Sequence, residues 1–286
     1  MKPGPFTYHD PASVDDLVGL LGSLEDVKLL AGGQSLMPML NMRYVIPDHV
    51  IDLNTISSLD GINDNGSALE FGAMTRQADV LENADVGNKA PLLHEALTHV
   101  GHFQTRNRGT IGGSLCNLDP SAELPVAALL YEAELSVQGP DGTRQVAMKD
   151  WPLAYMTPSL APEEVLTSIT MPYWTEPHGS SFMEFARRHG DFAIVAVGCL
   201  LAVEGGNITR AAIALGGAQQ TPYRLEEAEQ ALVGQPANEN TFKAAAEIAK
   251  SQDAMSDTYV QENYRKRLAG VLTQRALKQA AVRAGA

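Results

Sequence analysis

The stretch Lys28-Leu29-Leu30-Ala31-Gly32-Gly33-Gln34-Ser35-Leu36-Met37-Pro38 carries the strongest single indication of how this chain folds. A short apolar run leads into a Gly-Gly pair, which polar residues and a second apolar segment follow. Glycines permit a positive φ and leave backbone N–H groups open, and loops of this kind hold phosphate groups. The alternative is an ordinary turn between a strand and a helix, and this stretch alone leaves both interpretations open.

A second Gly-Gly loop, Thr110-Ile111-Gly112-Gly113-Ser114, favours the phosphate interpretation. Two such loops far apart in sequence, each with a serine close behind, are what a two-walled nucleotide site needs. Arg106 and Arg108 stand directly before the second loop and would supply positive potential where a diphosphate would lie. The alternative is that these arginines pair with surface carboxylates.

Composition limits the function classes. The 286 residues can hold two or three domains, and 21 basic against 34 acidic residues give a net charge of −13. This balance argues against nucleic acid as a partner. No apolar run approaches the ~20 residues of a membrane helix, and the first residues have no apolar signal region, so we expect a cytoplasmic protein that is not integral to the membrane. The two cysteines exclude an all-cysteine iron–sulfur or zinc site, which needs four ligands.

Apolar periodicity and turn residues predict an α+β protein in three parts. We expect an N-terminal α/β part over residues 1–59, a middle α+β part over residues 60–174, and a C-terminal part over residues 175–286. The C-terminal part is expected to hold three antiparallel strands, two of them joined at Glu204-Gly205-Gly206-Asn207. Helices should follow, with starts expected at Thr221-Pro222, at Thr241 and near Asp257.

Motifs for hydrolysis or metal binding do not fit. His94 and His99 are five residues apart, which places them on different faces of a helix, whereas the zinc-protease spacing is four. Neither Ser35 nor Ser114 lies in a Gly-x-Ser-x-Gly elbow, and there is no Walker-type loop. We therefore expect no catalytic residue and no metal ligand in this chain.

Four segments in order resemble the FAD-binding medium subunit of the molybdenum hydroxylases, the family of xanthine dehydrogenase and aerobic carbon monoxide dehydrogenase. The segments are Ala31–Pro38, Arg106–Ser114, Asp119–Pro125 and Arg187–Ala193, and the resemblance spans nearly the whole chain. It implies a two-subdomain FAD-binding fold, followed by a C-terminal domain of a three-stranded antiparallel sheet and a helical bundle.

The resemblance also implies a set of FAD-binding residues. Those expected to hold the diphosphate through backbone N–H groups are Ala31, Gly32, Gly33, Gln34, Ser35 and Leu36 in the first loop, and Thr110, Ile111, Gly112, Gly113 and Ser114 in the second. Asn117 and Glu123 would reach the ribityl chain and nearby polar atoms, and Leu166 the flavin ring region. Arg187 or Arg188, together with Phe192, would approach the isoalloxazine from the C-terminal domain. Many members carry Asp where Glu123 stands and Tyr where Phe192 stands.

The implied function is electron transfer by FAD within a complex. A molybdenum-binding large subunit would oxidise the substrate, an iron–sulfur small subunit would relay electrons, and this chain would pass them to an external acceptor. The molybdenum cofactor and [2Fe-2S] clusters are expected only in those partners, in a dimer of heterotrimers. The resemblance points to an N-heteroaromatic compound or carbon monoxide as substrate. The alternatives are a stand-alone FAD-dependent reductase and a flavin-free interaction subunit of the same fold.

Overall fold

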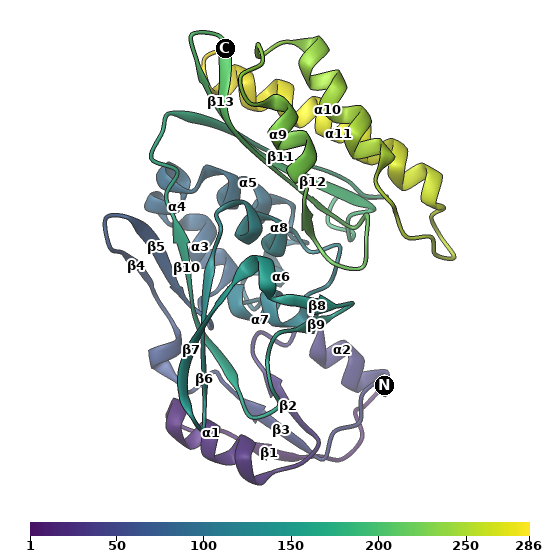
Figure 1. The fold of residues 1–286 in the computed structure, drawn as a ribbon. Coiled ribbons are helices and arrows are strands. Elements are labelled where there is room, and N and C mark those ends of the chain that lie inside the picture. Colours follow the sequence, from purple (N-terminus) through teal and green to yellow (C-terminus); the bar gives the residue numbers. More distant parts are fainter.

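The computed structural model describes all residues, 1–286, and the chain begins with a small parallel sheet, drawn in purple in Figure 1. Its strands are paired in the order β1-β3-β2. The Ser13 hydroxyl caps the following helix by accepting a hydrogen bond from the Asp16 N–H at 3.1 Å, and Leu17 and Leu21 are buried beneath that helix. The elements are β1 (Thr7–His9), α1 (Val14–Ser23), β2 (Val27–Leu30), α2 (Leu36–Asn41) and β3 (His49–Asp52).

The middle of the chain forms a five-stranded antiparallel sheet in the order β4-β5-β10-β6-β7. Helices α3 to α8 lie between this sheet and the C-terminal part of the molecule (Figure 1). The elements are η1 (Ser57–Leu59), β4 (Ile62–Asp64), β5 (Ala68–Gly72), α3 (Gln77–Glu82), α4 (Ala84–Lys89), α5 (Pro91–His99), α6 (Phe103–Arg106), α7 (Ile111–Asn117), α8 (Glu123–Leu130), β6 (Glu134–Gly139), β7 (Gly142–Ala147), η2 (Met148–Asp150), β8 (Pro152–Ala154), β9 (Thr157–Pro158) and β10 (Val165–Pro172). The short strands β8 and β9 pair only with each other.

The C-terminal sheet is antiparallel, as expected, but has four strands in the order β11-β12-β13-β14. The hairpin between β12 and β13 turns at Gly205 and Gly206, whose φ values of +58° and +81° suit the predicted Gly-Gly turn. The elements are β11 (His178–Phe185), β12 (Val195–Glu204), β13 (Asn207–Gly216), β14 (Tyr223–Arg224), α9 (Glu226–Leu232), α10 (Glu239–Ser251) and α11 (Glu262–Arg283).

The fourth strand corrects the helix start expected at Thr221-Pro222. Tyr223 and Arg224 pair with β13 instead, and the helix begins at Glu226. The Arg224 guanidinium donates two hydrogen bonds to the Glu229 carboxylate, at 2.7 and 2.9 Å, which holds the two-residue strand against the helix that follows. The pairing of these two residues with β13 therefore overrides the local preference of Thr221-Pro222 to begin a helix, and no pattern in the sequence predicts this pairing.

Packing on both faces of the C-terminal sheet makes it the middle layer of the upper half of the molecule. Helices α5 and α8 cover one face of the sheet, α9 and α11 pack on the other, and α10 packs against α9 and α11 (Figure 1). Every residue of α8 is buried, because the helix is packed on all sides. One cluster of 37 buried residues runs from the five-stranded sheet through these helices onto β12 and β13, so the middle and C-terminal parts share a core.

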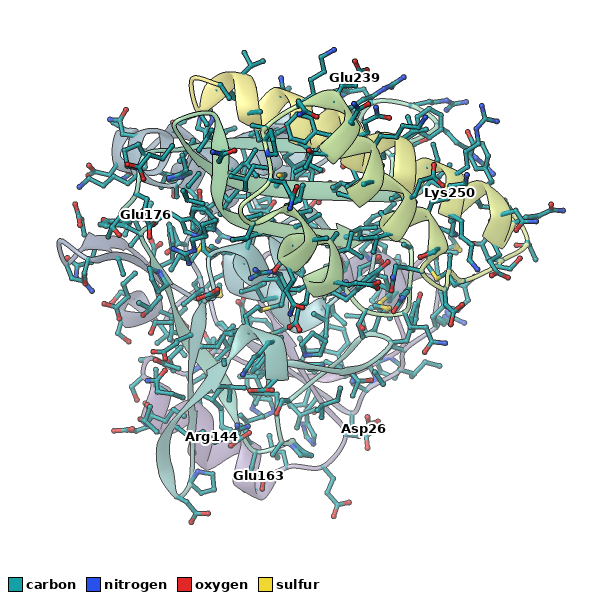
Figure 2. All side chains as sticks on the ribbon, turned by 45° about the horizontal axis from the view of Figure 1, so that its top comes forward. Asp26, Arg144, Glu163, Glu176, Glu239 and Lys250 are labelled. Atoms are coloured by element: carbon teal, nitrogen blue, oxygen red, sulfur yellow. The ribbon has the colours of Figure 1, made fainter.

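Charged side chains project outward from the surface, as Glu163, Glu239 and Lys250 do in Figure 2. No helix of the chain combines the length and the apolar composition needed to cross a bilayer.

Candidate functional site

The first glycine loop connects β2 to α2 and offers unpaired backbone donors. None of the N–H groups of Gly32, Gly33, Gln34 and Ser35 donates a hydrogen bond within the chain. Gly33 has a φ of +73°, a conformation that side-chain-bearing residues rarely adopt. Gln34 and Ser35 are exposed, and the Ser35 hydroxyl caps nothing. A run of free donors in a partly exposed loop is suited to an anion with several oxygen atoms.

The structure brings the two glycine loops together, as expected. A Cβ atom built on Gly32 would lie 2.2 Å from the Arg108 carbonyl oxygen and 2.7 Å from the Gly109 Cα atom. A Cβ atom on Gly113 would lie 3.4 Å from the Cβ atom of Ala31. The loops are thus in backbone contact, and glycine at position 32 is what permits it.

The second glycine segment differs from a free loop. Thr110 is the N-cap of α7, and its hydroxyl accepts a hydrogen bond from the Gly113 N–H at 3.0 Å. The Ile111 and Gly112 N–H groups donate to the carbonyl oxygens of Thr75 and Ala73, at 3.0 and 2.9 Å. Ser114 donates to the Thr110 carbonyl at 3.2 Å. The backbone donors from 111 to 114 are therefore engaged within the chain, whereas the first loop offers a run of free donors.

The arginines before the second segment form no ion pairs, contrary to the alternative of pairing with surface carboxylates. Arg106 donates to the Val100 carbonyl at 2.8 Å, and Arg108 is exposed. Sequence reasoning missed two neighbours, Asn54 and Arg76, which lie between the loops. Asn54 had a detectable signal, because the carboxyl ends of the adjacent parallel strands β2 and β3 meet at one edge. Arg76 had none.

Buried carboxyl groups lie beyond the second segment. Glu123, the first residue of α8, is 7% exposed, and its burial raises its pKa to about 7. The charges of Glu184 and His99 act on it, and Glu184 Oε1 lies 3.4 Å from His99 Nδ1. Glu184 Oε2 is buried without a hydrogen-bond partner. Because buried polar atoms in folded proteins are nearly always paired, an unpaired carboxylate oxygen here suits a ligand with hydroxyl groups.

Replacing Glu123 with glutamine should remove a pH dependence of stability. A folded-state pKa above the ordinary value favours folding at low pH, and this contribution is lost as the pH rises from about 4.5 through about 7. We expect the free energy of unfolding of E123Q, measured by urea titration without cofactor, to match wild type near pH 5. At pH 8 it should exceed wild type by on the order of 2–3 kcal/mol.

The control for this comparison is E204Q, because Glu204 is exposed at the end of β12. E204Q should follow the wild-type profile at both pH values. A difference between E123Q and wild type that is the same at pH 5 and pH 8 would contradict the assignment of a raised pKa to Glu123.

The expected residues at the C-terminal side of the site lie in the turn between β11 and β12. The turn contacts the segment before the second loop, since a Cβ atom on Gly190 would lie 2.9 Å from the His102 ring. The Arg187 guanidinium stacks over the Tyr259 ring at 5.0 Å, and Arg188 is exposed. Phe192 is 68% exposed, which leaves its ring free to cover a ligand.

Two further predicted residues differ in what they can offer. Asn117 ends α7, is half-buried and forms no side-chain hydrogen bond, so its amide is available. Leu166 lies in β10 and is 2% exposed within the shared core. Its side chain has almost no surface left for a flavin ring, so any contact there would have to be made by the backbone.

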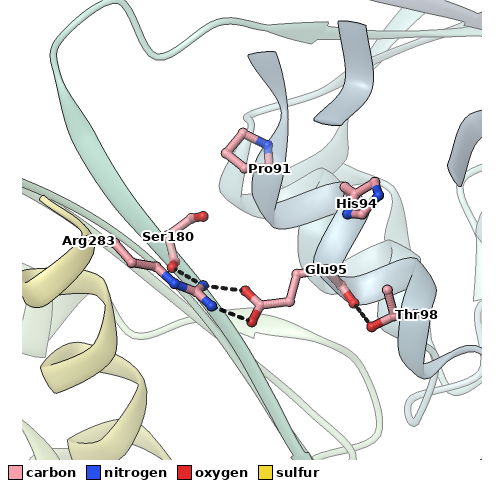
Figure 3. A pocket seen from close by; sticks show the side chains of 6 residues that line it. All are labelled: Pro91, His94, Glu95, Thr98, Ser180 and Arg283. Carbon is pink, nitrogen blue, oxygen red and sulfur yellow. Dashed lines mark hydrogen bonds and ion pairs between the residues drawn. The ribbon is translucent and has the colours of Figure 1, made fainter. Parts of the chain in front are cut away.

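A polar hollow of about 300 Å³ lies elsewhere, at the junction of α5, β11 and α11 (Figure 3). The Arg283 guanidinium donates to the Glu95 carboxylate at 2.8 and 3.1 Å and to the Ser180 carbonyl at 2.6 Å. Glu95 also accepts from the Phe182 N–H at 2.9 Å. These groups meet one another's hydrogen-bonding needs, so we interpret the hollow as part of the contact between the middle and C-terminal parts and not as a ligand site.

The chemical groups at and near the glycine loops are of the kinds that bind FAD. The free N–H donors of the first loop and the unpaired arginines beside it suit a diphosphate, and the Asn117 amide with the buried carboxyls suits a polyol chain.

Comparison with known proteins divides the chain between two family models. Residues 4–174 match the model described as the FAD binding domain in molybdopterin dehydrogenase. Residues 180–280 match the model described as the CO dehydrogenase flavoprotein C-terminal domain. Together they cover most of the chain.

Individual relatives match over their whole length. The chain is 35% identical to the carbon monoxide dehydrogenase medium chain of Afipia carboxidovorans, covering 99% of each protein. It is 36% identical to the nicotine 6-hydroxylase medium subunit of Paenarthrobacter nicotinovorans, covering 99% of this chain and all of that one. Its structure matches a chain of carbon monoxide dehydrogenase from Hydrogenophaga pseudoflava with a TM-score of 0.96 and 36% identity, covering 99% of each.

Proposed function

Because the chain belongs to the FAD-binding medium subunits of the molybdenum hydroxylases, we propose that it is the electron-transfer subunit of such a complex. It would take electrons from iron–sulfur clusters of a small subunit and deliver them to an external acceptor. FAD supplies the redox chemistry, while the protein supplies binding, orientation and electrostatics. The observation that carries the proposal is the run of free N–H donors from Gly32 to Ser35, packed against the second glycine segment.

We assign each of these residues a role in binding FAD, and the geometry of the loops supports the assignment. The first loop, from Ala31 to Leu36, holds the diphosphate with its free N–H groups. The second segment, from Thr110 to Ser114, forms the facing wall of the site, because its N–H groups from Ile111 to Ser114 are engaged within the chain. Asn117 and Glu123 accept or donate hydrogen bonds along the ribityl chain. The turn bearing Arg187, Arg188 and Phe192 covers the ring, and the backbone at Leu166 borders it.

Membership of the family supports a proposal for the partners and for the substrate. We propose that this chain assembles with a molybdenum-binding large subunit and an iron–sulfur small subunit into a dimer of heterotrimers. Within this chain we place the domain boundaries between residues 59 and 60 and between residues 174 and 175. The substrate of the complex is an N-heteroaromatic compound or carbon monoxide. The similarity to a nicotine 6-hydroxylase medium subunit supports the first, and the similarity to carbon monoxide dehydrogenase medium chains supports the second.

Purified protein tests the proposal directly. We expect the full chain to bind FAD in a 1:1 ratio, detected by its visible absorption bands and by quenching of flavin fluorescence on titration. Isolation from its native source should bring molybdenum-containing and iron–sulfur partner chains with it. Absence of flavin binding even after FAD addition would favour a flavin-free interaction subunit, and isolation with FAD but without partners would favour a stand-alone reductase.

A further inference from the structure

A chain of hydrogen bonds links the two glycine loops through side chains that neither loop contains. Asn54 donates from Nδ2 to the Ala31 carbonyl oxygen at 3.1 Å. Arg76 donates from Nη2 to the Asn54 side-chain oxygen and from Nη1 to the Arg108 carbonyl oxygen, the latter at 2.5 Å. Asn54 is itself held by its N–H, which donates to the Asp52 carboxylate at 2.9 Å. The bridge therefore ends on the first carbonyl of the first loop and on a carbonyl just before the second segment.

The bridge fixes the direction of a free donor. The Ala31 carbonyl and the Gly32 N–H belong to one trans peptide unit, so they point in opposite directions. Holding the carbonyl toward Asn54 turns the Gly32 N–H, the first free donor of the loop, to the other side. At the other end, the Arg108 carbonyl is held by Arg76 while the Gly109 N–H of that peptide donates to the Thr105 carbonyl at 2.7 Å.

The charge at the bridge is also unbalanced. The pKa of Arg76 is lowered, mainly because Arg76 is partly buried and secondly because the positive charge of Arg108 lies close to it. Neither forms an ion pair, although the chain carries 34 acidic residues and Asp52, Asp60 and Asp79 lie near enough to act on Arg76 at longer range. Two neighbouring guanidinium groups without a paired carboxylate favour an anion between the loops.

We propose that Arg76 is a positioning residue for the diphosphate of FAD, acting with Asn54 to hold the two glycine loops at the separation that the diphosphate requires. The inference rests on the proposed function, because it assumes that FAD is the ligand. It adds a residue outside both glycine motifs, contributed by the segment just before α3. Arg76 stabilises the site twice, through its bonds to the loops and through its charge.

The test is a titration of the full chain, freed of flavin, with FAD at low and high salt. R76A should raise the FAD dissociation constant by about tenfold or more, since hydrogen bonds to charged groups are among the stronger ones. Its affinity should also depend less on salt than that of wild type. R76K, which keeps the charge but can reach fewer partners, should fall between the two. N54A should weaken binding, and the N54A/R76A double variant should lose less than the two single losses combined, because one bridge is broken in both.

The control variant is R144A, because Arg144 (labelled in Figure 2) lies at the surface on β7. Its guanidinium is paired with the Glu164 carboxylate. R144A should bind FAD as wild type does. The melting temperature of each flavin-free variant separates positioning from folding, and that of R76A should stay near wild type. FAD binding by R76A equal to wild type overturns the inference alone, as does a loss of binding that merely follows a lowered melting temperature. Failure of the wild-type chain to bind FAD overturns the proposed function and the inference with it.

Discussion

Replacing Gly32 with alanine is expected to raise the dissociation constant of FAD by about a hundredfold or more. The added Cβ atom would lie 2.2 Å from the Arg108 carbonyl oxygen, far inside van der Waals contact. The position of a Cβ atom is fixed by its own backbone and the Arg108 oxygen belongs to the backbone, so no side-chain rotation can relieve the clash. The two glycine segments would have to separate, and the free donors at Gly32 and Gly33 would move relative to the second segment. Flavin fluorescence titration of the purified chain measures the effect.

Gly22 offers a matched control in the same part of the chain. It lies in α1, and a Cβ atom there would meet no atom within 4 Å. G22A should bind FAD as wild type does and melt at the same temperature or slightly higher, because alanine is the better helix former. Circular dichroism of G32A without flavin separates a local effect from unfolding. A folded G32A with wild-type FAD affinity would refute the contact between the loops as the basis of the site.

Much of the fold could be predicted from the sequence because its signals are local. Apolar runs and turn residues locate the three main sheets, and the Gly205-Gly206 pair locates the hairpin of the C-terminal sheet. Helix α8 was harder to predict. It is buried on every side, so it has no amphipathic pattern, and a short apolar run does not distinguish a strand from a buried helix.

The candidate site could be predicted only in part, for a related reason. Glycine pairs are visible in sequence, and the structure brings the two segments that carry them into contact. Whether their N–H groups are free depends on distant partners, and the carbonyls of Ala73 and Thr75 occupy donors of the second segment. The bridge joins Asn54 to Arg76 across 22 residues, and Arg76 to Arg108 across 32. Such pairings are set by how the sheets pack together and leave no local pattern.

Arginines tie the parts of the molecule together by donating to backbone carbonyl groups. Arg76 does so between the glycine loops, Arg283 between α11 and β11, and Arg224 between β14 and the end of α8. A guanidinium group carries five donors in a fixed plane, so it can hold several carbonyl oxygens at once. Arg265 also donates to backbone carbonyl oxygens, and with 4% of its surface exposed it is the most deeply buried of the four.

Replacing Arg265 with methionine is expected to lower the free energy of unfolding by about 3 kcal/mol and the melting temperature by roughly 5–10 °C. Arg265 lies in α11 and donates from Nη1 to the carbonyl oxygens of Ile194 and Gly217, each at 2.6 Å. Its Nη2 donates to the Asp257 carboxylate at 2.5 Å. Methionine fills a similar volume, so the loss would come from leaving these oxygens without donors in a buried position.

Because Ile194 follows the turn bearing Phe192, the same change should loosen the part of the site that the C-terminal sheet contributes. Limited proteolysis of R265M should cleave the turn around Arg187 and Arg188 faster than in wild type, and added FAD should protect it less. The control is R275M, since Arg275 lies in the same helix, is exposed and forms no ion pair. R275M should melt within about a degree of wild type, as surface substitutions usually do. Equal melting temperatures for R265M and R275M would show that the carbonyl contacts of Arg265 contribute nothing to the stability of the C-terminal sheet. Unchanged cleavage at the turn in R265M would show that these contacts do not order the part of the site around Phe192.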